Sequence, residues 1–441
     1  MTAALIGFTC VLLLAFLRVP IAFAMGFVGV LGVAHERGGL LDASGYVPAV
    51  SMAARQISDT AQDYGLSVIP LFILMGLFIN KGGLSRELYG LGNAFLGHMR
   101  GGLAMATVVA CGGFSAISGS SLATAATMSK VAIPEMRRYG YSDRLSSASV
   151  AAGGTLGILI PPSVILVIYG LLTETSIGKL FIAGVVPGLI GILFYLFAVR
   201  WTVFRDPEAG PRGERHSWRQ RGKAVVSVWA VLLLFVAIIG GLYGIFDFAP
   251  LNLTFSPTEV AGVGAMGAFL IALGRRRLTL ADTFEVLRES ALTSAGLFMV
   301  LIGAALFSNF MNLAGLPEAL VGFVTGYDLS PIAVILIIAA IYILLGCVFE
   351  SLSLLLLTVP IFFPVITTLG FDPVWFGIFV VVVTEIGMIT PPIGLNVFIL
   401  QAVMGNISTG TIFRGVTPFW VADIFRLALI IFVPGVVLVL L

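Results

Sequence analysis

The sequence carries little charge for its length. Only 10% of its 441 residues are Asp, Glu, Lys or Arg, whereas 59% are hydrophobic. Soluble domains carry a charge on about 25% of their residues, so the composition excludes an ordinary soluble protein. Apolar stretches of about 20 residues, the length that crosses the hydrocarbon core of a bilayer, recur along the whole chain. We therefore predict an all-α polytopic membrane protein.

Cysteine and histidine are also scarce, with three residues of each. The cysteines lie in apolar segments, which predicts buried thiols and not a disulfide framework. His35, His98 and His216 fall in loops or near membrane ends, so a serine nucleophile within the membrane would lack a general base. The net charge of +2 is too small to indicate a nucleic-acid partner. These absences argue against an enzyme and against a nucleic-acid-binding protein.

The apolar sequence divides into segments that we predict to be helices. These are residues 2–17, 19–34, 57–80, 143–172, 179–204, 224–246, 257–273, 289–313, 373–404 and 411–441. Two further apolar regions, residues 101–136 and 331–365, are too long for one spanning helix and are interrupted near their middles. Their arms of about fifteen residues correspond to roughly 22 Å of helix, too short to cross a bilayer alone. We predict two re-entrant helical hairpins, with a single long broken helix as the alternative for either.

Lysine and arginine are distributed unevenly among the predicted loops. Residues 200–223 hold seven of them, whereas residues 247–256 hold none. Because cytoplasmic loops are enriched in basic residues, the first loop is predicted to lie inside and the second outside. If neither hairpin crosses, nineteen of the 24 basic residues lie on the cytoplasmic side, three lie outside, and Lys130 and Arg426 fall within membrane segments. The first hairpin then opens to the cytoplasm and the second opens outward.

The two halves of the chain share a pattern of glycine and proline. The positions matched at a constant offset of 230 are Pro134 and Pro364, Gly140 and Gly370, Val150 and Val380, Gly157 and Gly387, and Pro161-Pro162 and Pro391-Pro392. An odd number of crossings separates the two hairpins, so the repeats would be inverted. Inverted repeats with discontinuous helices are typical of secondary transporters. The alternative is the general use of Gly and Pro by membrane helices.

A polar tract, GGFSAISGSSLATAATM at residues 112–128, interrupts the first hairpin. Non-helical backbone at membrane depth occurs only where it is buried in protein or lines a wet cavity. The hydroxyl groups that this tract offers belong to Ser115, Ser118, Ser120 and Ser121. Hydroxyl and carbonyl oxygens around a turn at Gly119 suit sodium, and the N-terminus of the following helix suits a carboxylate. We predict a ligand site here, with close helix packing by small residues as the alternative.

Two proline pairs mark matching breaks in membrane helices. They lie in GTLGILIPPS, residues 154–163, and in TEIGMITPPIGLN, residues 384–396. Proline removes a backbone donor and releases carbonyl groups, and a glycine four residues earlier permits unwinding. Thr155, Thr390 and Asn396 add side-chain oxygen or amide groups. We predict that each break faces its own hairpin tip, with simple helix kinks as the alternative.

Two glutamates lie at membrane depth. Glu350 belongs to the second hairpin tip together with Ser351 and Ser353, and Glu385 precedes the second proline pair. A carboxylate in the membrane is costly and usually functional. We therefore predict a site role for both, with helix capping or packing as the alternative.

Several of these motifs together resemble one transporter family. FSAISGSSLATAATM, IPEMRRYGY, GILIPPS, SIGKLFIAGVVPGL and ITPPIGLNVF are similar to segments of the large permease subunit, DctM type, of tripartite ATP-independent periplasmic (TRAP) transporters. The resemblance implies sodium-coupled import of a carboxylate, such as a C4-dicarboxylate or a sialic acid, across the bacterial inner membrane. It also implies two partners, a periplasmic substrate-binding protein and a small four-helix membrane subunit. Because no four-helix extension precedes Met1, we expect that subunit to be a separate chain.

The residue pattern and the resemblance give two sets of candidate ligands. The predicted sodium ligands are Ser115, Ser118, Gly119, Gly157, Pro161, Glu350, Ser353, Thr384, Glu385, Gly387 and Thr390. The predicted substrate ligands are Ser118, Ser120, Ser121, Thr155, Ser351 and Asn396. Sodium is the expected coupling ion, and no organic cofactor is expected. Family members often have Asp at the position of Glu350, so this chain departs from the family there.

The predicted architecture has inverted repeats with two opposed hairpins and two broken helices, similar to elevator-type ion transporters. Its parts are residues 1–98 for scaffold helices and a first arm, 99–172 for the first transport repeat, 173–328 for scaffold helices and a second arm, 329–404 for the second transport repeat, and 405–441 for a C-terminal helix. Two other functions stay open. One is an organic anion carrier, coupled to protons or sodium, that needs no binding protein, and the other is a channel.

Overall fold

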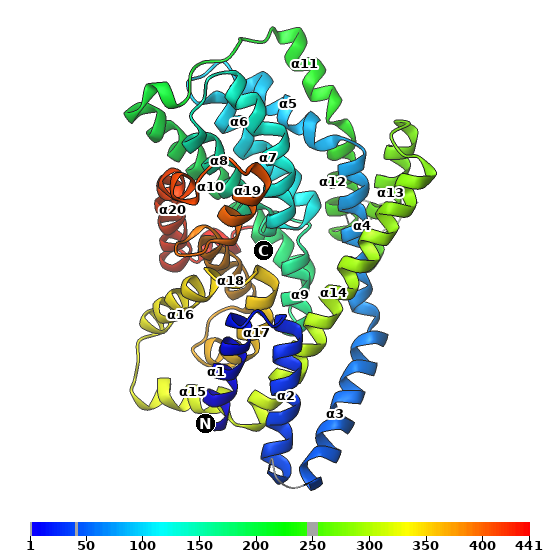
Figure 1. The fold of residues 1–441 in the computed structure, drawn as a ribbon, viewed down its shortest axis with the longest axis vertical. Helices are drawn as coiled ribbons and strands as arrows, with labels where there is room; N and C mark the ends of the chain where they lie inside the picture. The colour runs from blue at the N-terminus through cyan, green and yellow to red at the C-terminus, as the bar shows by residue number, and fades with distance from the viewer. Residues whose placement is uncertain (1, 40–42, 245–254) are drawn as a thin grey trace.

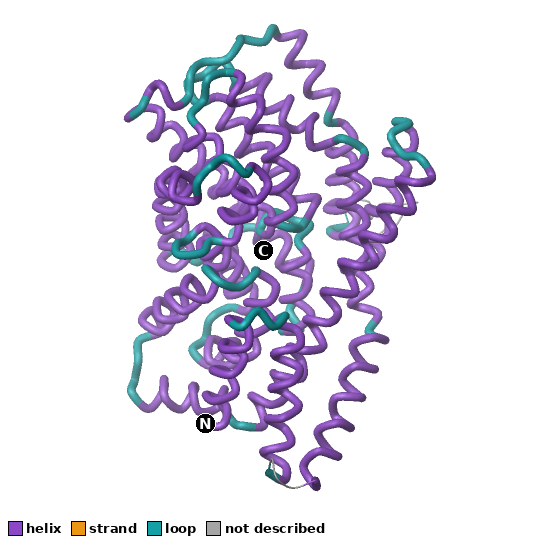
Figure 2. The backbone as a smooth tube through the Cα atoms, in the orientation of Figure 1, coloured by secondary structure: helices purple, strands orange, loops and turns teal. Residues whose placement is uncertain are grey.

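The computed structural model describes residues 2–39, 43–244 and 255–441, which form helices joined by loops, with no β-strand among them (Figure 1, Figure 2). Six helices in these ranges are long and apolar enough to cross a membrane. The pair α11 (Trp218–Ser227) and α12 (Trp229–Leu242), bent by 48°, is a seventh span if the two helices cross together. These spans agree with the predicted membrane protein. Residues 247–254 of the predicted loop 247–256 and the last two residues of the predicted helix 224–246 lie outside the described ranges.

Four helices open the chain: α1 (Thr2–Phe16), α2 (Ile21–Gly38), α3 (Ala43–Gln62) and α4 (Val68–Lys81). The prediction of one helix at residues 57–80 was wrong, because α3 begins earlier and α4 is separate from it. A search for apolar runs does not detect α3, because polar residues recur along one face of the helix. The opposite face packs on α2 and α14. Asp63 ends this helix, since its side chain accepts a hydrogen bond from the Gly65 N–H (2.7 Å) and starts the 3-10 turn Tyr64–Ser67.

The next series contains α5 (Leu84–Leu96), α6 (Gly102–Ser118), α7 (Ser121–Arg138), α8 (Asp143–Thr155), α9 (Val164–Leu172) and α10 (Ile177–Arg205). α6 and α7 are the arms of the first predicted hairpin. Gly119 turns the chain between them in a left-handed conformation (φ +61°), which glycine adopts without steric cost. α8 gives way to the 3-10 turn Leu156–Ile158, and α9 resumes only after the cis Pro161-Pro162 bond. The predicted break in this helix is therefore confirmed.

The remaining helices are α13 (Pro257–Gly274), α14 (Leu280–Leu313), α15 (Leu316–Gly326), α16 (Pro331–Gly346), α17 (Ser351–Thr368), α18 (Pro373–Ile389), α19 (Leu395–Met404), α20 (Thr409–Phe432) and α21 (Gly435–Leu438). α14 begins nine residues before its predicted start because Thr279 and Asp282 form a capping box there. The last predicted helix, residues 411–441, ends instead at Phe432. Pro434 follows and cannot continue the hydrogen-bonding pattern.

The order of elements repeats along the chain. The series α15–α20 follows the same order as α5–α10, and α17 and α18 begin 230 residues after α7 and α8. Glycines with positive φ precede matching helices, Gly83 and Gly315 before α5 and α15, and Gly140 and Gly370 before α8 and α18. Figure 1 shows α5, α6 and α7 in one half of the molecule and α15, α16 and α17 in the other. The pair α6 and α7 and its equivalent, the pair α16 and α17, therefore lie in opposite halves of the molecule.

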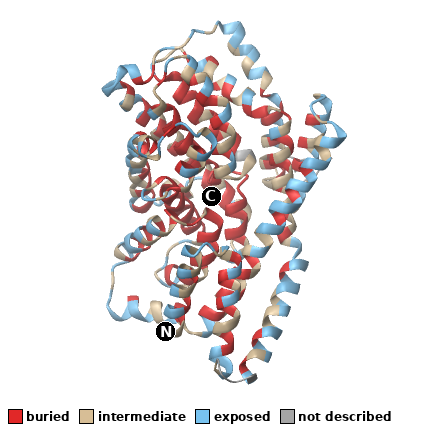
Figure 3. Ribbon diagram, in the orientation of Figure 1, coloured by how far each residue is buried: buried red, intermediate tan, exposed pale blue. Residues whose placement is uncertain are grey.

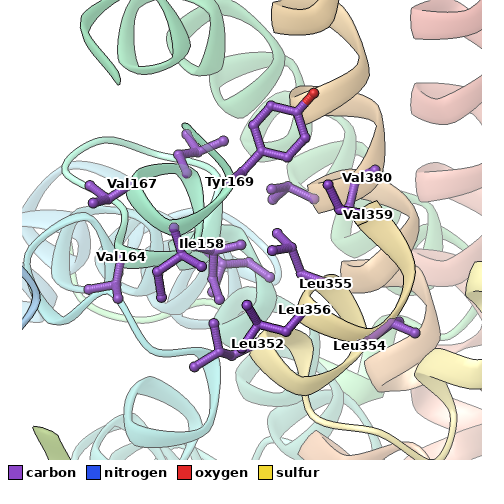
Figure 4. Packing of buried hydrophobic residues seen from close by; sticks show 14 of the residues in the cluster. Ile158, Val164, Val167, Tyr169, Leu352, Leu354, Leu355, Leu356, Val359 and Val380 are labelled. Carbon is purple, nitrogen blue, oxygen red and sulfur yellow. The ribbon is translucent and has the colours of Figure 1, made fainter. Parts of the chain in front are cut away.

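Burial is greatest where the two series meet. Residues 145–155 of α8 and 374–389 of α18 are all buried. In Figure 3 buried residues fill the centre of the molecule, whereas outer helices such as α3 carry many exposed ones. Figure 4 shows buried apolar side chains of both series, with Ile158, Val164 and Val167 on one side of the view and Leu354, Leu355 and Leu356 of α17 on the other. The two broken helices therefore lie at the centre, and other helices surround them.

Candidate functional site

The first hairpin tip lies against the first helix break. A Cβ atom placed on Gly157, within the break, would lie 1.7 Å from the Cβ of Ser115, near the end of α6. A Cβ atom on Gly119, at the turn, would lie 3.1 Å from Cγ2 of Val164 at the start of α9. The structure therefore brings together the predicted sodium ligands Ser115, Gly119 and Gly157, next to the buried Pro161.

The second hairpin tip meets the second break in the same way. A Cβ atom on Gly387 of α18 would lie 2.6 Å from the Cα of Gly346, the last residue of α16. One residue further on, the carbonyl of Cys347 accepts a hydrogen bond from the Gly394 N–H (3.1 Å). Each break thus contacts the tip of its own hairpin, which is the pairing that the sequence predicts.

Asn396 joins the first hairpin to the second broken helix. Its Nδ2 donates to Ser121 Oγ (2.7 Å) and to the carbonyl of Ala151 in α8 (3.0 Å). Its Oδ1 is buried without a hydrogen-bond partner among the described residues. Asn396 and Ser121, both predicted substrate ligands, therefore lie together, although 275 residues separate them.

The hydroxyl groups of the first tip have local partners. Ser118 Oγ lies 2.8 Å from Thr124 Oγ1, Ser120 Oγ accepts from the Ala123 N–H (3.3 Å), and Ser115 Oγ donates to the carbonyl of Cys111. A hydroxyl that donates one hydrogen bond keeps two lone pairs. These contacts fix the orientation of the side chains and leave their oxygens able to accept from, or coordinate, a ligand.

The second tip is organised by Glu350. Its carboxylate caps α17, accepting hydrogen bonds from the N–H groups of Leu352 (3.2 Å) and Ser353 (3.3 Å), and from Ser351 Oγ (3.2 Å). Ser351 and Ser353 are buried. Glu350 thus has the capping role that the sequence left open as the alternative, and a sodium role for it stays a prediction.

The predicted threonine ligands hydrogen-bond within and around the breaks. Thr155 Oγ1 lies 3.2 Å from the hydroxyl of Tyr195 in α10, and Thr390 Oγ1 accepts a hydrogen bond from Trp420 Nε1 in α20 (2.9 Å). Thr384 donates to the carbonyl one turn earlier in its own helix. Thr155 and Thr390 therefore connect the two breaks to α10 and α20.

A buried ionic cluster surrounds Glu385. Arg426 Nη2 lies 2.5 Å from Glu385 Oε2 and 2.9 Å from Asp423 Oδ1, while the Tyr195 hydroxyl donates to Asp423 Oδ2 (2.5 Å). All four side chains are buried. With Thr155, the cluster forms a continuous chain of polar contacts from the first break to the second. When the acids are ionised, one positive charge faces two negative ones.

Sequence reasoning identified Glu385 in this cluster but missed Tyr195, Asp423 and the role of Arg426. A signal was present, because Asp423 and Arg426 are three residues apart in an apolar helix and so share one face. A charged pair inside a membrane helix indicates a buried partner. The sequence does not show that this partner is Glu385 of α18.

A basic recess of about 510 Å³ lies beside the return arm of the first hairpin. Lys130 of α7 lines it together with Lys81, Arg86 and Arg277. Lys81 is already paired with Asp282 (3.3 Å) and Glu285 (2.5 Å). Within the described ranges, Arg86 and Lys130 form no ion pair. The recess therefore places positive charge beside the first hairpin, whereas the hairpin tips carry no basic residue.

The fold is that of a polytopic helical membrane protein. The chain aligns with the solved Alcanivorax borkumensis YdaH transporter at a TM-score of 0.66, over 96% of this chain and 97% of that one. Sequence identity is only 16%, so this likeness concerns the fold alone.

The chain belongs to the family described as tripartite ATP-independent periplasmic transporter, DctM component, whose profile matches residues 8–436. It is 39% identical to the C4-dicarboxylate TRAP transporter large permease protein DctM of Pseudomonas aeruginosa, over 89% of this chain and 90% of that protein. It is 32% identical to the sialic acid TRAP transporter large permease protein SiaM of Vibrio cholerae, over 97% and 96% of the two chains. The resemblance predicted from the motifs is thus confirmed.

Proposed function

We propose that this chain is the membrane permease of a sodium-coupled importer for a carboxylate substrate. The observation that carries the proposal is the repeated pairing of a hairpin tip with a helix break, at Ser115 with Gly157 and at Gly346 with Gly387, in a chain of the TRAP large permease family. Discontinuous helices near the midplane of inverted repeats form the substrate and ion sites of many secondary transporters.

Sodium is favoured as the coupling ion by the chemistry around both breaks. Serine and threonine hydroxyls, carbonyl groups freed at the proline pairs, and few formal charges are suited to a monovalent hard cation. The proposed first sodium site lies between residues 115–121 and 155–162, and the second between residues 349–353 and 384–392. The net negative charge of the cluster around Glu385 further favours a cation near the second break.

An anionic substrate is favoured by two observations. The relatives named above are described as carrying C4-dicarboxylate or sialic acid. The basic recess around Lys130 would attract an anion to the cytoplasmic side of the first hairpin. The proposed substrate ligands are the hydroxyls of the tips and the amide of Asn396, whose unpaired Oδ1 can accept a hydrogen bond from the substrate or from a water molecule that bridges to it.

The proposed motion is a sliding of one rigid unit, the elevator mechanism. We assign to the moving unit the two hairpins, the two broken helices, and also α10 and α20. The reason is that α20 packs chiefly on α8, α10 and α18, and α10 packs chiefly on α20, α6, α18 and α9. This assignment differs at α10 and α20 from the residue ranges suggested by the sequence. Helices α1–α4 and α11–α14 form the proposed frame, with the small membrane subunit beside it, and α5 and α15 are the proposed arms that join frame and moving unit.

The test is uptake into proteoliposomes that contain this chain with its small subunit and binding protein. A labelled carboxylate taken up through the binding protein should accumulate only with an inward sodium gradient. The half-saturating sodium concentration should rise about fivefold or more in Ser118→Ala and Thr390→Ala, since each removes one oxygen ligand. Thr368→Ala, at the exposed end of α17, is the control. Undiminished uptake without sodium would favour a proton-coupled carrier, uptake without binding protein an independent carrier, and non-saturating flux a channel.

A further inference from the structure

A large groove lies at the end of the molecule where α8 begins and α10 ends. Its volume is about 980 Å³, and its walls are α10, α20, the first turn of α8 and the turn that follows α10. None of the predicted sodium or substrate ligands lines it. The groove is therefore a feature apart from the tips and breaks.

Apolar and aromatic side chains form most of the wall. Phe197 and Trp201 of α10 and Phe425 of α20 line the groove and are 69%, 53% and 66% exposed. Both α10 and α20 have the length and composition of membrane-spanning helices. Exposed aromatic side chains on such helices face lipid, and tryptophan is enriched where the acyl chains meet the headgroups.

Three arginines converge on the same groove. Arg144 lies in the first turn of α8, Arg205 is the last residue of α10, and Arg414 lies in the second turn of α20. Arg144 Nη2 donates to the carbonyl of Arg414 (3.0 Å), and the Arg205 guanidinium stacks 4.8 Å from the Trp201 ring centroid. These contacts hold two of the side chains in place without neutralising them.

The arginines carry positive charge that the protein does not balance. None of the three forms an ion pair within the described part of the chain, although the exposed Asp206 also lines the groove. By the distribution of basic residues, this end of the molecule faces the cytoplasm. The cytoplasmic leaflet carries anionic lipids, and basic pockets between helices on that side bind their headgroups.

We propose that the groove binds an anionic phospholipid, with its phosphate on Arg144, Arg205 and Arg414 and an acyl chain along Phe197 and Phe425. A water-soluble anion would pair with the arginines but would make no favourable contact with the aromatic wall. A neutral lipid would pack its acyl chains on the wall but would leave the positive charge of the arginines without a counter-charge. An anionic phospholipid satisfies both, and bound there it joins α8, α10 and α20 at their cytoplasmic ends. The inference does not depend on which ion drives transport.

The experiment is native mass spectrometry of the purified, delipidated protein. It is offered phosphatidylglycerol and phosphatidylcholine with the same acyl chains in equal amounts. Phosphatidylglycerol should be retained selectively, and its ratio to phosphatidylcholine should fall about fivefold for each of Arg144→Gln, Arg205→Gln and Arg414→Gln, from roughly 1 kcal/mol per basic side chain. Arg205→Lys should retain most of the selectivity. Arg219→Gln, an exposed arginine of α11 outside the groove, is the matched control and should change nothing.

A second variant tests the apolar wall separately. Phe197→Ala should lower retention of both lipids without changing their ratio, because it removes acyl-chain contact and no charge. Equal retention of the two lipids by the unaltered protein, or an equal loss of selectivity in Arg219→Gln, would overturn the proposal. A cysteine at Val421, which lines the groove, that cross-links to the small membrane subunit in native membranes would show that protein covers this surface, and would overturn it as well.

Discussion

Two glycines set how closely the hairpin tips approach the helix breaks. Gly157 and Gly387 lie at equivalent positions of the two repeats, and at each the neighbouring tip occupies the space of a side chain. At Gly157 the nearest atom is the Cβ of Ser115, and at Gly387 it is the Cα of Gly346. Neither atom can move away without a shift of the backbone, because side-chain rotation displaces only atoms beyond Cβ. Glycine is required at both positions because a side chain there would collide with the neighbouring tip.

Gly157→Ala and Gly387→Ala should each separate a tip from its break. We expect each to destabilise the protein by about 1–3 kcal/mol, the usual cost of overpacking, and to reduce sodium-driven uptake at least tenfold. Thermal unfolding in detergent and uptake into proteoliposomes measure the two effects. Gly296→Ala in α14, where an added Cβ meets nothing within 4 Å, is the control. Normal uptake by both variants would show that the tips need not contact the breaks.

Among the elements, α20 depends on its charged pair. Arg426 and Asp423 lie on the face of α20 that packs on α8, α10 and α18, and Gly191 of α10 leaves room for the guanidinium, since a Cβ there would lie 2.4 Å from Arg426 Nη1. Burying an ion pair adds little net stability, but removing one partner leaves an uncompensated charge. The cluster therefore fixes which face of α20 meets α18 more than it strengthens that contact.

Arg426→Met should be strongly destabilising, by about 3–5 kcal/mol, because Glu385 and Asp423 would be left buried without their counter-charge. Adding Glu385→Gln to Arg426→Met should recover part of that loss, since one of the unpaired charges is then removed. Unfolding of the two single variants and the double variant in detergent forms a double-mutant cycle. Strictly additive losses would contradict the pairing of these side chains.

For the whole molecule, sliding of the moving unit can be followed where it meets the frame. Phe363 of α17 and the residues Ala304, Ser308 and Asn312 of α14 line one cavity between the two parts. The α14 residues are four apart and so about 6 Å apart along the helix. In a variant without native cysteines, a cysteine at Phe363 should cross-link to more than one of these three positions, and each cross-link should stop uptake. A cysteine at Leu292, exposed on α14, is the control. Cross-linking of position 363 to only one of the three α14 positions throughout transport would exclude sliding.

We predict the orientation of the molecule in the membrane from the distribution of its basic residues. Single cysteines placed at Arg212 or Arg219, in the region between α10 and α12, should resist membrane-impermeant thiol reagents in intact cells. A cysteine at Ser256, at the start of α13, should label. The reverse pattern would invert the assignment of both hairpins, and with it the leaflet proposed for the phospholipid.

Much of the fold was accessible from local patterns. The breaks at Pro161-Pro162 and Pro391-Pro392 and the turn at Gly119 express rules of backbone geometry that act within a few residues. Their recurrence at an offset of 230 residues is what makes the repeat visible in the sequence. α3 was missed for the same reason, because its apolar residues are too sparse to form a transmembrane run and become meaningful only against α2 and α14.

Composition and local backbone chemistry alone predict the membrane class, the turn at Gly119 between two helices and the two broken helices. The family follows from the resemblance of short motifs to those of known permeases. Which groups meet became known from the folded structure: Asn396 with Ser121, Glu385 with Arg426, and three arginines from separate helices in one groove. The physical reason is that hydrogen bonds and ion pairs depend on distances of about 3 Å between residues far apart in the chain. Those distances are set by the packing of whole helices.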